Sequence, residues 1–152
     1  MTTIAANRQC MSADRKVTDG DVSYSCIKLR EINGSIVGVA GDNPAIVKFW
    51  AWYRASLTSK TVKAPEFNKK HSLAALVLTA KGSLLVYDTD CVPDVVEDDY
   101  WAIGTGRQAA LAAMLLGHEP EEAIAVAQEV DTCTGGVVDT FWLKKGRVRS
   151  KD

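Results

Sequence analysis

Residues 2–6 read Thr2-Thr3-Ile4-Ala5-Ala6, a run of β-branched and apolar side chains that directly follows Met1. This composition predicts a β-strand at the start of the chain. Because the residue after Met1 is small, we expect Met1 to be removed, which makes Thr2 the amino terminus. A terminal threonine can serve as nucleophile and base together. Its hydroxyl attacks, and its α-amine, with a reference pKa of about 7.7–8.0, accepts the proton.

Length and charge limit the classes of protein that this chain can belong to. The 152 residues are 47% hydrophobic, enough for one domain with a real core, which we expect to span residues 1–152. The net charge of −1 argues against nucleic acid as a partner and against binding to an anionic membrane. No apolar run is long enough to span a bilayer, and no signal peptide is recognisable, so we expect the cytoplasm as its location.

Cysteines and histidines are few and widely spaced: Cys10, Cys26, Cys91, Cys133, His71 and His118. Their spacing matches neither a CxxC metal motif nor a disulfide framework, so reduced thiols and no metal site are expected. No cofactor is required for hydroxyl–amine chemistry. Whether a structural monovalent cation binds is left open.

Strand patterns dominate the first forty residues. A second strand is predicted over 9–13, and the polar segment Lys16–Asp21 is interpreted as a loop. Tyr24–Ile32 and Ser35–Ala40 are β-rich arms joined by Asn33-Gly34, which favours a type I′ turn with positive φ at both residues.

The next element is an amphipathic helix. Asn43 is its predicted cap and Pro44 its first residue, and a polar loop is predicted over Lys60–Ser72. The later elements, in order, are a hairpin (Leu73–Thr79 and Ser83–Tyr87), an acidic connection (Asp88–Asp99), a strand (Tyr100–Ile103), two helices (Arg107–Leu116 and Pro120–Asp131), a strand (Val137–Leu143) and a flexible tail (Lys144–Asp152). This order indicates an α+β domain with antiparallel sheets between helical layers.

Several short blocks carry a resemblance to a known family. They are, in chain order, Thr2-Thr3-Ile4, Ser12-Ala13-Asp14, Lys28-Leu29-Arg30-Glu31-Ile32, Val37-Gly38-Val39-Ala40-Gly41, Trp101-Ala102-Ile103-Gly104-Thr105-Gly106 and Asp131-Thr132-Cys133-Thr134-Gly135-Gly136. Together they resemble the proteasome β-subunit family of N-terminal nucleophile (Ntn) hydrolases, most closely the HslV-type bacterial threonine peptidases. The resemblance implies a four-layer αββα sandwich.

The resemblance also implies roles for residues around Thr2. Lys28 matches the lysine whose charge lowers the pKa of the nucleophilic hydroxyl, and Asp14 matches the aspartate that pairs with it. Gly41 matches the residue whose N–H stabilises the oxyanion. Without the family context, Asp14 and Lys28 would be interpreted as an exposed cross-strand ion pair, worth roughly 0.2–1 kcal/mol.

Three further residues complete the implied site. Asp131 and Thr134 match the aspartate and hydroxyl residue that contact the threonine amine and the hydrolytic water, and Thr105 matches a family serine near the nucleophile. A helix C-cap cluster is the alternative reading of Asp131 and Thr134. The candidate catalytic set is therefore Thr2, Asp14, Lys28, Gly41, Thr105, Asp131 and Thr134.

Two features depart from the family pattern. Asp42 follows Gly41 where a small residue is common, which predicts a carboxylate at the rim of the specificity pocket. The interval Ser59–Ser72 is too short and too polar for the second long helix of HslV-type chains, a region that helps to build ring contacts in the family.

The function expected from these observations is a threonine peptidase that acts on peptides or unfolded proteins as a self-compartmentalising homo-oligomeric ring. An ATP-dependent unfoldase is a candidate partner. Two alternatives stay open: an amidase for small substrates on the same fold, and a ring or assembly protein without catalytic activity.

Overall fold

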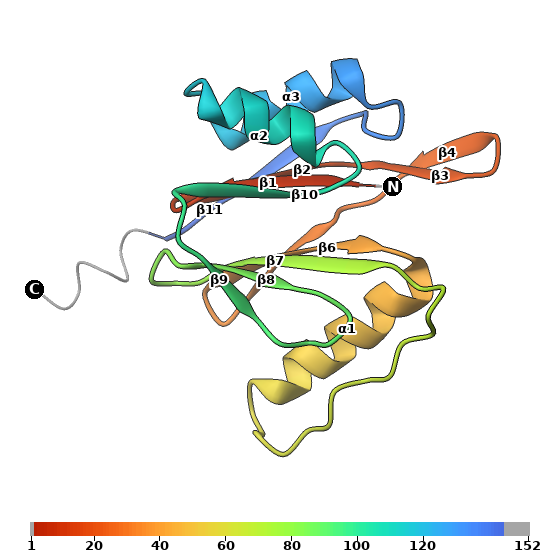
Figure 1. The fold of residues 1–152 in the computed structure, drawn as a ribbon, viewed down its shortest axis with the longest axis vertical. Coiled ribbons are helices and arrows are strands. Elements are labelled where there is room, and N and C mark those ends of the chain that lie inside the picture. Colours follow the sequence, from red (N-terminus) through yellow and green to blue (C-terminus); the bar gives the residue numbers. More distant parts are fainter. Residues whose placement is uncertain (1, 145–152) are drawn as a thin grey trace, which may run out of the picture.

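Two antiparallel sheets lie face to face in the structure, a computed structural model that describes residues 2–144 (Figure 1). The first sheet contains, in spatial order, β10 (Tyr100–Gly104), β1 (Thr3–Asn7), β2 (Cys10–Asp14) and β11 (Val138–Trp142). The second contains β5 (Leu29–Ile32), β6 (Ser35–Gly41), β7 (Leu73–Leu78), β8 (Leu84–Tyr87) and β9 (Asp94–Val96). The predicted removal of Met1 concerns a residue outside the described part, and so does the predicted flexible tail over Lys144–Asp152 except for Lys144 itself.

Helices cover the outer face of each sheet (Figure 1). α2 (Arg107–Leu115) and α3 (Pro120–Val130) pack against the first sheet, and α1 (Asn43–Ser56) packs against the second. Buried side chains form three clusters, one between the sheets and one under each helical layer, as expected for four stacked layers. The predicted αββα sandwich is confirmed.

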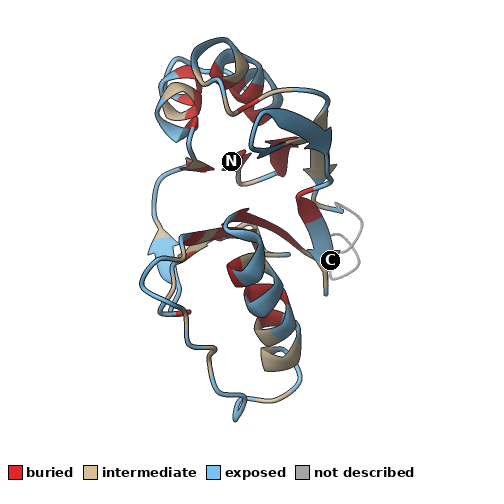
Figure 2. Cartoon of the chain, turned by 90° about the vertical axis from the view of Figure 1, so that its right-hand side faces the viewer, coloured by how far each residue is buried: buried red, intermediate tan, exposed pale blue. Residues whose placement is uncertain are grey.

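Strand β1 is the central element for the site, because its alternate side chains enter two different layers. Ile4 and Ala6 belong to the cluster between the sheets, whereas Ala5 belongs to the cluster under α2 and α3. Figure 2 shows the buried residues concentrated on the strands and on parts of the helices. Because side chains two positions apart on a strand point to the same face, Thr3 faces the helical layer, like Ala5.

The predicted loop over Lys16–Asp21 is wrong. The segment forms β3 (Lys16–Asp19), which pairs with β4 (Val22–Ser25) in a hairpin that projects beside the start of the chain (Figure 1). The predicted arm Tyr24–Ile32 is also interrupted, because β4 ends at Ser25 and β5 begins at Leu29. Most of the hairpin is exposed, so the sequence carries no alternation of buried and exposed side chains to reveal it.

Local turn chemistry was predicted more accurately. Asn33 and Gly34 have φ values of 51° and 81°, which confirms positive φ at both central residues of the β5–β6 turn.

Two element boundaries differ from the prediction. The predicted N-cap of α1 is wrong by one residue, since Asp42 rather than Asn43 is the N-cap. The acidic connection also contains a short edge strand, β9, directly after Pro93.

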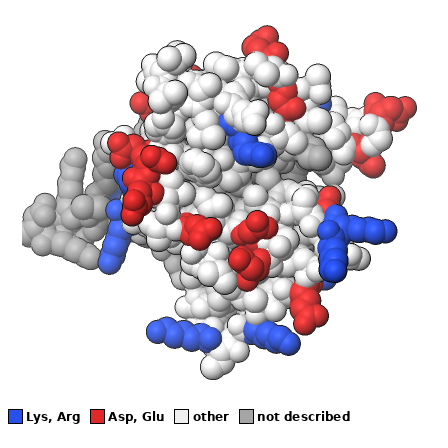
Figure 3. Space-filling view, viewed as in Figure 1, with Lys and Arg blue, Asp and Glu red and all other residues white. Residues whose placement is uncertain are grey.

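The chain from the end of α1 to the start of β7 contains no helix, as the composition of that interval predicted. Among the described residues, no helix has the length and apolar character needed to cross a membrane. Acidic and basic side chains are interspersed on the face shown in Figure 3, in keeping with the small net charge.

Candidate active site

Thr2 lies at the entrance to β1, where the ends of neighbouring strands hold its backbone. The Thr105 N–H donates to the Thr2 carbonyl at 3.0 Å, and Thr3 pairs with Gly104 across β1 and β10. Gly104 has φ +97°, and a Cβ there would overlap the Thr2 carbonyl. Only glycine allows this approach, so the strand end at Gly104 determines where Thr2 can lie.

Lys28 and Asp14 form the predicted ion pair, and it is buried. The Lys28 Nζ lies 3.0 Å from Asp14 Oδ1, with side-chain exposures of 6% and 0%. Lys28 Nζ also donates to the Lys16 carbonyl at 2.7 Å. Asp14 accepts from the backbone N–H groups of Thr3 at 3.0 Å and Gly135 at 3.1 Å. The pair therefore differs from an exposed cross-strand pair, because both charges are removed from water and held in one geometry.

Burial lowers the pKa of Lys28, and the adjacent Asp14 carboxylate opposes this effect only in part. Lys28 and Thr2 line the same pocket. A cation that is poorly solvated by water interacts more strongly with a developing alkoxide than a surface lysine does.

Asp131 lies directly after α3 and organises a second cluster. Its Oδ2 accepts the hydroxyls of Thr105 at 2.5 Å and Thr134 at 2.6 Å, and its Oδ1 accepts the Cys133 N–H at 3.2 Å. Burial raises the pKa of this carboxyl, but the three hydrogen bonds outweigh it, so the pKa of Asp131 lies below its ordinary value. Asp131 is thus a hydrogen-bonded carboxylate at neutral pH, and it is also the C-cap residue of α3, with its N–H donating to the Ala127 carbonyl.

Two pockets meet at Thr2 and Gly41. The Arg107 pocket has a volume of about 200 Å³, and its walls include Leu73, Thr105 and Arg107. The Trp50 pocket has a volume of about 130 Å³ and lies toward α1. Its lining comprises Thr2, Val17, Cys26, Ile27, Lys28, Arg30, Val39, Gly41, Asn43, Ile46 and Trp50. A chain that lies across Thr2 can therefore place side chains on both sides of it.

Gly41 has φ +139°, and a Cβ there would overlap the Ser72 carbonyl. The position therefore requires glycine for reasons of backbone geometry, as well as any role of its N–H. The prediction that the Asp42 carboxylate lies at the rim of the specificity pocket is wrong. Asp42 lines neither pocket, because its Oδ2 accepts the Ser72 N–H at 2.8 Å, and Asn43 lines the Trp50 pocket instead.

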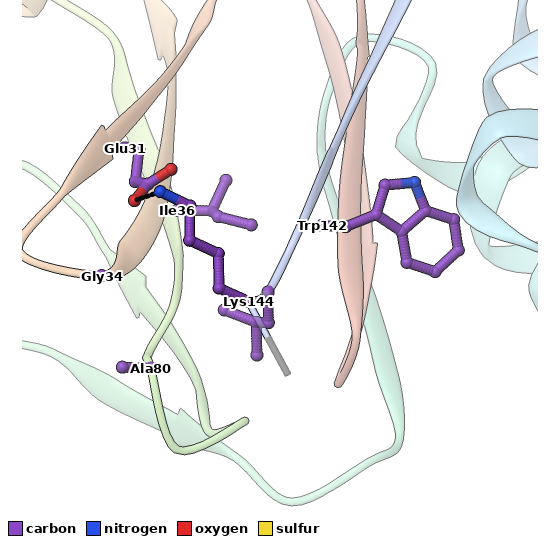
Figure 4. Close-up of a pocket in the computed structure, with 7 residues that line it drawn as sticks. Glu31, Gly34, Ile36, Ala80, Trp142 and Lys144 are labelled. Atoms are coloured by element: carbon purple, nitrogen blue, oxygen red, sulfur yellow. Dashed lines mark ion pairs between the residues drawn. The ribbon is translucent and has the colours of Figure 1, made fainter. Parts of the chain in front are cut away.

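Another hollow lies between the strand ends near Lys144 (Figure 4). There Lys144 Nζ pairs with Glu31 Oε1 at 3.2 Å, and the space is about 10 Å³. It is too small for a substrate side chain and lacks Thr2. Within residues 2–144, no group of three or more His, Cys, Asp or Glu side chains is placed to hold a metal ion.

The structure brings all seven candidate residues to one region, yet the sequence interpretation gave no role to three residues that hold them together. Thr3 is fully buried between the two clusters, Gly104 adjoins the Thr2 carbonyl, and Gly106 donates its N–H to the Thr3 hydroxyl at 3.0 Å. A polar residue at a strand position that alternation assigns to the interior was the available signal for Thr3.

Comparisons with known proteins agree with this architecture. No family model matches the sequence, and no curated protein matches it significantly. Solved structures, in contrast, do match this chain. The eukaryotic HslV from Trypanosoma brucei superimposes with a TM-score of 0.75 at 21% identity, covering 93% of this chain and 99% of that one.

A protein named BPH from Thiobacillus denitrificans superimposes with a TM-score of 0.66 at 15% identity, covering 95% of this chain and 98% of the other. Its complex with epoxomicin gives a TM-score of 0.66 at 14% identity, covering 94% and 98% of the two chains. The resemblance stated from the sequence is thereby confirmed at the level of the fold.

Proposed function

We propose that a chain with this fold and this arrangement around Thr2 is a threonine peptidase whose mature amino terminus is Thr2. One observation carries the proposal. Thr2 lies where two pockets meet, between a buried Lys28–Asp14 pair and a hydroxyl cluster organised by Asp131. Folding alone does not require a buried cation beside a strand terminus, since desolvation of the pair costs free energy.

The proposed reaction uses Thr2 both as the nucleophile, through its hydroxyl, and as the base, through its α-amine. The Thr2 Oγ attacks the scissile carbonyl and its proton passes to the α-amine, while Lys28 stabilises the developing alkoxide. The Gly41 N–H stabilises the negative charge on the carbonyl oxygen. The C–N bond breaks as the α-amine returns the proton to the leaving amine. Water, deprotonated by the same amine, then attacks the ester carbonyl; the acyl C–Oγ bond breaks, the α-ammonium returns its proton to the Thr2 Oγ, and the acid is released.

Intact mass spectrometry with a peptide epoxyketone tests the nucleophile. This reagent forms a ring with a hydroxyl and an amine of one residue, so a stable adduct requires a free amino-terminal threonine or serine. We expect a mass without Met1 and one adduct per chain. A similar reagent, epoxomicin, is bound in the Thiobacillus denitrificans BPH structure. A chain that retains Met1 and forms no adduct would remove the proposal.

Assembly into a homo-oligomeric ring, in the cytoplasm and with an ATP-driven unfoldase, belongs to the same proposal and is supported by the HslV-like fold. The missing helix between α1 and β7 favours the alternative, an amidase that acts on small substrates without a sealed chamber. Digestion assays with folded protein, unfolded protein and short peptides distinguish the two. An inactive assembly protein would cleave none of them.

The Trp50 pocket predicts a preference among substrates. The Arg30 guanidinium carbon lies 4.4 Å from the centroid of the Trp50 ring, so the pocket combines an apolar wall with a cation. We expect peptides with Glu before the scissile bond to be cleaved faster than those with Lys, and Arg30→Glu to reverse the order. Exposed charge pairs are worth up to ~1 kcal/mol, so the change is about fivefold in each direction.

The ratio of kcat/KM values for the two peptides measures this preference. Arg30→Lys is the matched control, because it keeps the charge and should keep the order. An unchanged ratio in Arg30→Glu would show that the substrate side chain does not approach Arg30.

A further inference from the structure

Thr3, the residue after the proposed nucleophile, connects the two clusters of the site. Its N–H donates to Asp14 Oδ1 at 3.0 Å, and its Oγ1 lies 2.6 Å from the Thr134 Oγ1. The Thr3 side chain is fully buried and lines neither pocket at Thr2. Thr3 thus contacts both the Lys28–Asp14 pair and the Asp131 cluster without reaching the space for substrate.

The direction of the hydrogen bonds follows from counting donors. Asp131 is a carboxylate and can only accept, so the Thr134 hydroxyl gives it its single hydrogen. The Thr134 oxygen must then accept the hydrogen of the Thr3 hydroxyl. The Thr3 oxygen in turn accepts the Gly106 N–H at 3.0 Å. The chain of hydrogen bonds therefore has one direction, from the Gly106 N–H through the hydroxyls of Thr3 and Thr134 to the Asp131 carboxylate.

The backbone beside Thr3 leaves room for this chain of hydrogen bonds and for little else. A Cβ at position 106 would overlap the Thr3 hydroxyl oxygen and lie 3.0 Å from the Thr134 hydroxyl oxygen. Glycine at 106 therefore keeps both hydroxyls in place. Each hydrogen bond in such a chain polarises the next, which strengthens the last one, to the carboxylate.

We propose that Thr3 is a positioning residue of the peptidase, which orients Thr134 and Asp131 through its hydroxyl and anchors the start of β1 to Asp14 through its N–H. The inference rests on the proposed function. The Thr3 N–H is a backbone group that substitution leaves in place, so a side-chain variant tests the hydroxyl alone. Thr3→Val replaces that hydroxyl with a methyl group of similar volume.

The measurement is the rate of epoxyketone adduct formation, separated into the maximal rate constant and the reagent concentration at half-maximal rate. We expect Thr3→Val to lower the maximal rate constant roughly 10- to 100-fold, because misdirected groups near a reacting atom cost rates of this order. The half-maximal concentration should stay unchanged, since Thr3 lines neither pocket. Thr3→Ser, which keeps the hydroxyl, should react at nearly the wild-type rate.

A double-variant cycle distinguishes a connected chain from local packing. If Thr3 acts through Thr134, Thr3→Val should slow a Thr134→Val protein no further. Additive losses, a wild-type rate in Thr3→Val, or a Thr3→Ser protein as slow as Thr3→Val would each overturn the inference. If Thr3→Val does not fold, Thr3→Cys replaces it, since a thiol keeps the size but donates only weakly.

The failure of this inference can be distinguished from failure of the proposed function. An adduct on Thr2→Ala equal to that on the wild type would contradict the function itself. An inert Thr2→Ala protein together with a fully reactive Thr3→Val protein would contradict only the role of Thr3.

Discussion

Replacing Thr2 with alanine is expected to lower kcat/KM for peptide hydrolysis by roughly 10⁴-fold or more, the scale on which enzymes lose activity without their nucleophile. The α-amine, the Lys28–Asp14 pair and both pockets remain, so the loss reports the hydroxyl and γ-methyl groups of Thr2, of which only the hydroxyl can attack. Binding should survive, because Thr2 contributes one small side chain to each pocket. Initial rates on a broad peptide library, measured for both proteins, supply the comparison.

Thr2→Ser is the matched control for this experiment. It keeps a hydroxyl and an amine on the same residue and should retain measurable hydrolysis. The oligomeric state of Thr2→Ala, followed by native mass spectrometry, should equal that of the wild type. Equal hydrolysis by Thr2→Ala and wild type across the library would exclude Thr2 as the nucleophile.

Replacing Lys28 with methionine is expected to reduce both activity and stability. Methionine fills a similar volume but leaves the Asp14 carboxylate buried without its cation, and breaking a buried pair in this way costs about 3–5 kcal/mol. Hydrolysis should fall roughly 10²- to 10⁴-fold, the range for a lost proton-transfer or charge-stabilising group. Chemical denaturation measures the free energy of unfolding, and peptide assays measure the activity.

The double variant Asp14→Asn with Lys28→Met distinguishes the two effects. Removing both charges eliminates the uncompensated carboxylate, so much of the lost stability should return. Activity should not return, because the cation beside Thr2 is still absent. A double variant that regains hydrolysis would show that Lys28 serves only the fold, and a stable Lys28→Met protein would contradict the burial of the pair.

The parts of the fold predicted correctly are those encoded by neighbouring residues. The Asn33-Gly34 turn needs positive φ at two adjacent positions, and that requirement is visible in two letters of sequence. The β3–β4 hairpin was missed although Gly20 lies in its turn with φ +62°, because its strands are exposed and lack an alternating pattern. The short strand β9 depends on pairing with β8, a partner that its own residues do not reveal.

The candidate site shows the same division. The family-like blocks located Asp14, Lys28 and Asp131 without any coordinates, since each lies in a recognisable run of residues. Thr3 was not singled out, because its importance lies in contacts with Gly106 and Thr134, which are more than a hundred positions away. Hydrogen bonds of this kind leave no local pattern.

The amino-acid sequence by itself indicated a strand at the start of the chain, the order of the three helices and the main sheet strands, and the residue types available near Thr2. Only the tertiary structure decided that the Lys28–Asp14 pair is buried and that Thr3 joins it to the Asp131 cluster. The physical reason is that side-chain alternation and turn chemistry are properties of neighbouring residues. Desolvation and the direction of a hydrogen-bond chain depend on groups that only folding brings together.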